Sequence, residues 1–198
     1  MNRHLFTFYA RPPHIVARAL LGQRLVRITE TGERLVGCIV ETEAYGGADD
    51  MPSHASNGLT TRNKPMFGPP GRAYVYFIYG MYWMFNIVAH EISTPPGAVL
   101  VRALAPEKGI KTMQVNRNGR PKSLLTNGPA RLAQALGVDK TFNEADLCKH
   151  PFLYIEPGEQ IPDGAIACGP RVRAPGTDQE AKLRPWRFWI RDNPYVSS

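Results

Sequence analysis

Glycine and proline recur along the whole chain and limit the length of every helix and strand. Each supplies 18 of the 198 residues, and neither is concentrated in one segment. Because proline lacks a backbone donor and glycine favours turns, the elements between them must be short. Most apolar runs between these breaks have the length and composition of strands. We predict a single α+β domain, residues 1–198, with a curved, mostly antiparallel β-sheet forming a partly open, barrel-like roll, and short peripheral helices.

Two pairs of strand-like runs flank turn sequences and predict β-hairpins. Residues 23–28 and 34–45 flank "TETGE", and residues 73–79 and 81–89 flank Gly80, where we expect a protruding hairpin. Further strands are predicted at 97–105, 153–156, 165–172 and 186–191, and helices at 12–22 and 128–137. Both helices have proline near the start and glycine at the end, which are ordinary boundary signals.

The charge of the chain favours an acidic partner. The formal net charge is +7 and the pI is about 9.5, which indicates nucleic acid ahead of a membrane surface. The span Gly109–Val138 contains no Asp or Glu, and it carries Lys111, Arg117, Arg120, Lys122 and Arg131. Such a span suits contacts with phosphates, although it is also typical of a solvated face.

Targeting and cysteine signals point to a soluble, non-secreted protein. There is no run of eighteen apolar residues, and the N-terminal segment lacks the apolar core of a signal peptide. The three cysteines, Cys38, Cys148 and Cys168, are too far apart for a CxxC site and are odd in number. We expect reduced thiols, no metal and a cytoplasmic location, nucleoid-associated if the source is bacterial.

Two carboxylates stand at the end of an apolar run in "IVETEAY". Alternation in a strand places Glu41, Glu43 and Tyr45 on one face. A partly desolvated glutamate there could act as a general base. The same residues could equally be solvated charges at a strand end or partners in ion pairs.

Two basic side chains also invite a functional interpretation. His54 lies in the long polar segment 46–72 and either lines a pocket or is simply exposed. A metal site formed with Asp49 and Asp50 is a weaker hypothesis, because the three residues are loosely spaced. Arg102 lies inside an apolar strand and needs a partner, which could be Glu43 or a phosphate, unless it faces solvent on an edge strand.

The stretch "YVYFIYGMYWMFN" contains more aromatic rings than a hairpin needs. Most of these rings are expected in the core, but Tyr79 precedes the turn glycine and should stand exposed at the tip. An exposed ring on a basic protein suggests a wedge or a stacking platform for bases. Regular alternation sends Tyr76 to the opposite face, where it could line a pocket.

Together, "ETEAY", His54, "YVYFIYGMYWMFN" and "LVRALAP" resemble the alkyladenine (3-methyladenine) DNA glycosylase family, of the methylpurine type rather than the helix-hairpin-helix type. "NGPARLAQALGV" and "RPWRFWIRDNPYVS" are similar to its later segments, so that the resemblance extends from about residue 8 to the end of the sequence. Between residues 110 and 127 the chain is shorter than the vertebrate-type members of that family.

The resemblance implies an enzyme that flips a damaged purine out of duplex DNA and hydrolyses its N-glycosidic bond. It assigns Glu43 as the general base, with Arg102 and the backbone of Val172 helping to hold the attacking water. It implies base excision repair of 3-methyladenine-type lesions by a monomer that needs no cofactor. Because no lysine stands in the matched motifs, we expect a monofunctional glycosylase that leaves an abasic site.

The resemblance also assigns the residues that hold the base. Tyr45, His54 and Tyr76 would form the walls around it, and Tyr79 would fill the vacated space in the duplex. Asn86 would exclude guanine, although an Asn at a strand end often caps a turn. The alternative from a different class is a non-catalytic, basic, β-rich module that binds single-stranded nucleic acid.

Overall fold

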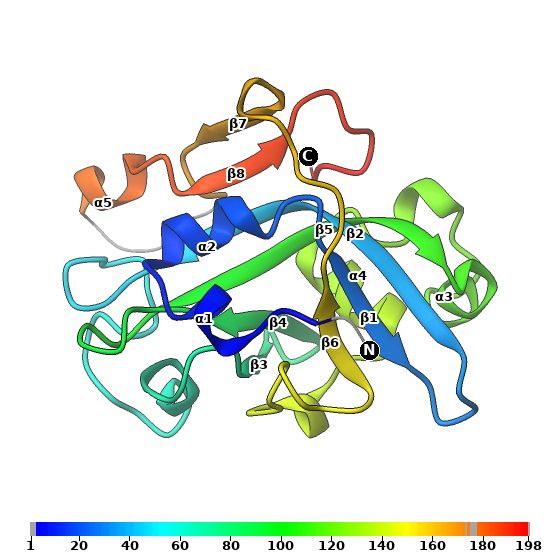
Figure 1. Cartoon of the computed structure of the whole chain (residues 1–198), viewed down its shortest axis with the longest axis horizontal. Helices are drawn as coiled ribbons and strands as arrows, with labels where there is room; N and C mark the ends of the chain where they lie inside the picture. Colours follow the sequence, from blue (N-terminus) through cyan, green and yellow to red (C-terminus); the bar gives the residue numbers. More distant parts are fainter. Residues whose placement is uncertain (1–2, 173, 175–177, 198) are drawn as a thin grey trace.

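Eight strands form one sheet in which every pairing is antiparallel. The computed structural model describes residues 3–172, 174 and 178–197. The strands are β1 (Arg24–Ile28), β2 (Arg34–Tyr45), β3 (Ala73–Ile78), β4 (Tyr82–Val88), β5 (Ala98–Lys108), β6 (Leu153–Glu156), β7 (Ile166–Gly169) and β8 (Arg187–Ile190). Their order is β3-β4-β5-β2-β1-β6, and β8 joins β2 to β7 (Figure 1). The α+β class, the open antiparallel sheet and both hairpins are confirmed.

The long strand β2 lies at the centre of the sheet and carries both glutamates. It pairs with β5 along most of its length, with register shifts on both sides of Glu41. These shifts mark β-bulges, which re-aim side chains along a strand. On its other side β2 pairs with β8, so that Glu43 lies opposite Arg187. The two carboxylates are therefore inside the sheet, and neither has any exposed surface.

Short helices cover the two faces of the sheet. They are α1 (Phe6–Tyr9), α2 (Pro13–Ala19), α3 (Ile110–Asn116), α4 (Pro129–Leu136) and α5 (Gln179–Leu183). In Figure 1, α2 lies in front of β2 and β5, and α4 lies behind the sheet, where it packs on β4 and β5. The predicted helix boundaries hold for α4, which begins at Pro129 and ends before Gly137 in a left-handed conformation.

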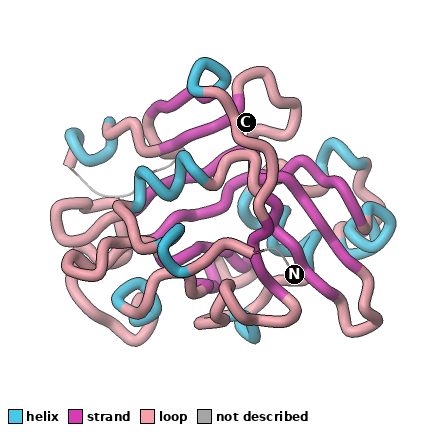
Figure 2. The backbone as a smooth tube through the Cα atoms, viewed as in Figure 1, coloured by secondary structure: helices cyan, strands magenta, loops and turns pink. Residues whose placement is uncertain are grey.

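Several segments of the fold contain only single turns of helix. The 3₁₀ turns are η1 (Lys64–Phe67), η2 (Lys122–Leu124), η3 (Lys140–Phe142) and η4 (Asp163–Ala165). Residues 46–72 form the predicted long connection, interrupted by η1, and Figure 2 shows how much of the backbone runs in loops and turns. No helix in the described part of the chain is long and apolar enough to cross a membrane.

Candidate active site

The structure gathers all eight predicted site residues around one cavity of about 490 Å³. These residues are Glu43, Tyr45, His54, Tyr76, Tyr79, Asn86, Arg102 and Val172. They come from β2, β3, β4, β5, the loop 46–72 and the segment after β7, and the start of α4 completes the wall. The individual roles of these residues remain predictions. Glu43 and Val172 lie 129 residues apart in the sequence, and the fold brings them together at this cavity.

Glu43 lies on the wall of this cavity with no exposed surface and with three polar neighbours. Its Oε1 accepts a hydrogen bond of 2.6 Å from the backbone N–H of Val172 and lies 3.3 Å from Nη1 of Arg102. Its Oε2 accepts a 2.8 Å hydrogen bond from the Tyr45 hydroxyl. Because each carboxylate oxygen has two lone pairs, Oε2 keeps acceptor capacity for a water. The possibility that Glu43 is a solvated strand-end charge is wrong.

Arg102 is buried between the two glutamates of β2. Its Nε donates to Oε1 of Glu41 at 2.8 Å, and its Nη2 donates to Oγ of Ser197 at 3.0 Å. Glu41 also accepts from Nε of Arg187 at 2.7 Å. The prediction of a carboxylate partner for Arg102 is confirmed, and the solvent-facing alternative is wrong. Sequence reasoning missed Arg187 and Ser197, although Arg187 shares with Arg102 the signal of a cation inside an apolar strand.

Three rings in edge-on or tilted contact form the aromatic side of the cavity. The centroid of the His54 ring lies 4.6 Å from that of Tyr76, at an interplanar angle of 69°, and Tyr74 lies 5.2 Å from Tyr76. A 3.0 Å hydrogen bond joins Nδ1 of His54 to the Tyr74 hydroxyl. Burial raises the pKa of Tyr76 to about 12 and raises that of Tyr45 well above its usual value, so both phenols stay protonated.

His54 is half-buried, so the exposed-loop alternative for it is wrong. Burial, and then the positive charge of Arg62, lower the pKa of His54 below its ordinary value of 6.5. The guanidinium of Arg62 also lies over the Tyr76 ring, 5.0 Å from its centroid. Among the residues that the structure describes, no cluster of three His, Cys, Asp or Glu side chains could hold a metal ion.

Asn86 is buried in the middle of β4, opposite Tyr74 of β3. Its Nδ2 donates a 3.0 Å hydrogen bond to the Tyr74 carbonyl. The possibility that it caps a turn at a strand end is therefore wrong. This bond fixes the amide plane, so that the polar group facing the cavity has a defined orientation.

Tyr79 stands at the tip of the β3–β4 hairpin and is 73% exposed. Its φ is 55° and that of Gly80 is 67°, and Met81 N donates to Ile78 O at 3.2 Å. Two consecutive positive φ values are typical of the turns that join twisted strands, and a tyrosine adopts this conformation only with strain. The predicted opposite facing of Tyr76 and Tyr79 is wrong, because the strand ends at Ile78 and both rings line the same cavity.

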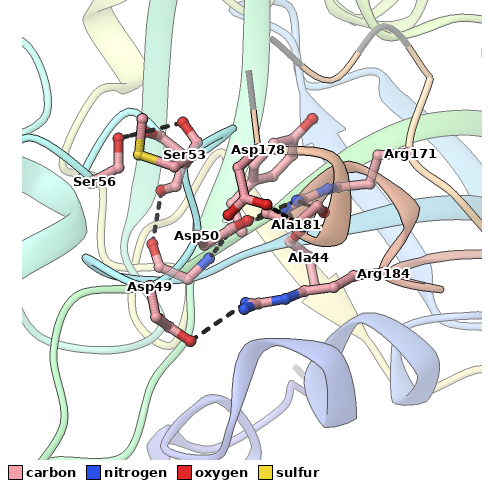
Figure 3. A network of polar contacts seen from close by, with 12 residues as sticks. Ala44, Asp49, Asp50, Ser53, Ser56, Arg171, Asp178, Ala181 and Arg184 are labelled. Atoms are coloured by element: carbon pink, nitrogen blue, oxygen red, sulfur yellow. Dashed lines mark hydrogen bonds and ion pairs between the residues drawn. The ribbon is translucent and has the colours of Figure 1, made fainter. Parts of the chain in front are cut away.

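A buried ion pair between Arg171 and Asp50, drawn in Figure 3, lies next to Tyr45 of the cavity wall. Arg171 donates to both oxygens of Asp50, at 2.7 and 2.6 Å, and to the carbonyls of Ala44 and Ala181. Its guanidinium lies 4.8 Å from the centroid of the Tyr45 ring. Arg171 therefore ties the end of β2, the loop that carries His54 and the segment that carries Val172 together. Sequence reasoning did not identify this pair.

A basic hollow of about 540 Å³ opens beside the cavity. It is lined by Tyr82, Arg117, Arg120 and Arg131, and it shares Arg131 and its neighbour Ala130 with the cavity. The acid-free span noted in the sequence thus lies next to the site. The site therefore combines a buried carboxylate on the wall of an aromatic cavity with a cationic hollow beside it.

Comparison with known proteins specifies the class further. The family model for Methylpurine-DNA glycosylase matches residues 7–194. A protein of Myxococcus xanthus described as "Putative 3-methyladenine DNA glycosylase" is 45% identical over 96% of this chain and 91% of its own length. Proteins with the same description from Carboxydothermus hydrogenoformans and Methanocella arvoryzae are 45% and 44% identical over 96% of this chain, and over 96% and 93% of their own lengths. The chain belongs to the methylpurine-DNA glycosylase family, a family of DNA repair enzymes.

Proposed function

We propose that the protein is a monofunctional DNA glycosylase that removes 3-methyladenine-type purines from duplex DNA and leaves an abasic site. The observation that carries this proposal is the setting of Glu43. A buried carboxylate is retained in a sheet at a high desolvation cost. Here it is held by Val172, Tyr45 and Arg102 and still faces the cavity.

The damaged nucleotide leaves the duplex in this proposal, because a base that stays stacked in the helix cannot enter a cavity of the protein. Flipping costs a few kcal/mol of lost stacking and pairing. Base–aromatic stacking, about 1–3 kcal/mol for each ring by substitution, offsets that cost. In this proposal Tyr76 and His54 supply the stacking surfaces in the cavity, and Tyr79 fills the vacated space; its exposure at the hairpin tip supports that role.

The reaction is a hydrolysis at the anomeric carbon. A water held against Glu43 loses a proton to the carboxylate while its oxygen bonds to C1′, and the electrons of the N-glycosidic bond leave with the purine. The sugar passes through an oxocarbenium-like state, which the negative charge of Glu43 stabilises. An alkylated adenine carries positive charge and departs without an acid, so one carboxylate suffices.

The substrate preference follows from the walls of the cavity. The electron-rich faces of Tyr45 and Tyr76 attract a cationic base by about 0.5–2 kcal/mol. Asn86, with its amide held by Tyr74, excludes the 2-amino group of guanine. Among the described residues that line the cavity there is no lysine, which fits hydrolysis without a Schiff base. The enzyme acts as a monomer on damaged duplex DNA in the cytoplasm.

Incubation of the protein with methylated duplex DNA tests this proposal. The expected products are free 3-methyladenine, detected by chromatography, and abasic sites that are cleaved only after alkali treatment. Unmethylated DNA serves as the control. Tight binding of single-stranded DNA with no release of base would instead support the non-catalytic binding module.

A further inference from the structure

Every polar atom of Ser197 is used in the charged cluster beside Glu43. Its backbone N–H donates to Oε2 of Glu41 at 2.7 Å, and its hydroxyl donates to Oε1 of the same carboxylate at 2.9 Å. The hydroxyl oxygen also accepts from Nη2 of Arg102 at 3.0 Å, and the carbonyl accepts from Nη2 of Arg187 at 3.1 Å. Ser197 is buried and lines the cavity.

These contacts determine which nitrogens of Arg102 bind Glu41 and Ser197 and which one is left for Glu43. Its Nε is bonded to Glu41 at 2.8 Å and its Nη2 to Ser197, while its closest approach to Glu43 is 3.3 Å. An arginine with two free nitrogens would form a bidentate pair with Glu43. Such a pair would occupy both carboxylate oxygens and make Glu43 a poor acceptor for a proton from water.

We propose that Ser197 and Glu41 are positioning residues that hold Nε and Nη2 of Arg102, so that only Nη1 reaches Glu43 and the carboxylate keeps an oxygen free to act as a base. This inference rests on the proposed function. The segment around Ser197 then forms part of the active site, although it lies far from the other site residues in sequence. Glu41, with no exposed surface and four hydrogen bonds from Arg102, Arg187 and Ser197, fixes the segment in place.

The charged and titratable groups around Glu43 set the direction of the pH effect. They are Glu41 and Tyr45 of β2, Tyr76 of β3, Arg102 of β5 and Arg187 of β8. When the Ser197 hydroxyl is removed, Nη2 of Arg102 loses its partner, and we expect it to turn towards Glu43. A closer cation stabilises the carboxylate over the protonated acid, so the acid limb of the pH–rate profile should move to lower pH.

The test is single-turnover release of base from methylated duplex DNA across pH 5–9 with wild type, Ser197→Ala, Ser197→Thr and Val196→Ala. We expect Ser197→Ala to bind DNA like wild type and to melt at a lower temperature, because two buried hydrogen bonds to charged groups are lost. It should lose roughly 10-fold in plateau rate, the size typical of one or two lost hydrogen bonds, and show the acid limb at lower pH. Ser197→Thr keeps the hydroxyl and should restore both. Val196→Ala changes the neighbouring side chain and should have no effect.

The outcomes separate this inference from the proposed function. If wild type releases no purine, the proposed function fails. If wild type is active and Ser197→Ala matches it in rate and pH profile, the positioning role of Ser197 is wrong. A loss of rate without a shift of the acid limb, or an equal loss in Val196→Ala, would show a merely structural role and also overturn the inference. Should Ser197→Ala not fold, Ser197→Cys, with a weaker donor and acceptor of similar shape, gives the same comparison.

Discussion

The strained, exposed tyrosine at the hairpin tip gives a prediction with opposite signs for stability and function. Tyr79 has a φ of 55° and is 73% exposed, so its ring buries little surface in the free protein. A left-handed conformation costs an L-residue with a full side chain about 1–2 kcal/mol, whereas Asn tolerates it. Tyr79→Asn should therefore raise the free energy of unfolding by about 1 kcal/mol, or about 2–4 °C in Tm for a chain of this size.

The same substitution should weaken base flipping. Loss of one stacking ring removes about 1–3 kcal/mol from the extrahelical state, which corresponds to about 5- to 150-fold in lesion-specific affinity. Fluorescence of a 2-aminopurine placed beside the lesion reports flipping, and thermal melting reports stability. Tyr79→Phe keeps the ring and should behave like wild type in the fluorescence assay.

One result would refute this reasoning about Tyr79. A Tyr79→Asn variant with wild-type flipping amplitude and affinity, and with a Tm several degrees lower, would show that the ring packs in the core. The wedge role and the claim of strain would then both be wrong.

Three further predictions concern the walls and the support of the cavity. Asn86→Ala should raise the release of 7-methylguanine relative to 3-methyladenine in a lesion panel, and an unchanged ratio would make Asn86 purely structural. Asp50→Asn leaves the buried Arg171 without its counter-charge, and it should lower stability by about 3–5 kcal/mol in chemical denaturation; an effect below about 1 kcal/mol would contradict that pairing. Burial and Arg62 lower the pKa of His54 below its unfolded value of 6.5, so the folded state resists protonation and stability should fall as pH drops below 6.5. His54→Gln should reduce this loss of Tm between pH 7 and 5, and an unchanged pH dependence would exclude His54 as a source.

The elements that were predictable from sequence are those set by local signals. The hairpin around "TETGE" and the helix that ends at Gly137 depend on a turn residue and a short apolar run, and both occur as predicted. α3 was not predicted, because its seven residues follow Gly109 without a side-chain cap. The bulges beside Glu41 could not be seen in the sequence, since they arise from the pairing of β2 with β5.

The composition of the site was predictable only through the resemblance, and its supporting contacts were not predictable at all. Alternation alone placed Glu41 and Glu43 on one face but left them as solvated charges, ion-pair partners or a base. The partners that decide between these are distant in sequence, as with Ser197, which lies 156 residues from Glu41. Arg171 and Asp50 are likewise 121 residues apart, and only the folded sheet brings them together.

The central claim is that Glu43 is the base that activates water, and Glu43→Gln tests it most directly. The glutamine oxygen can still accept the hydrogen bond from Val172, and its amide nitrogen can donate to the Tyr45 hydroxyl oxygen. Folding and affinity for lesion DNA should therefore be kept. Single-turnover excision should fall by at least about 10²–10⁴-fold, the usual contribution of a general base. Glu30→Gln, an exposed carboxylate, is the matched control and should excise normally. A Glu43→Gln enzyme that binds and excises at nearly the wild-type rate would contradict the account.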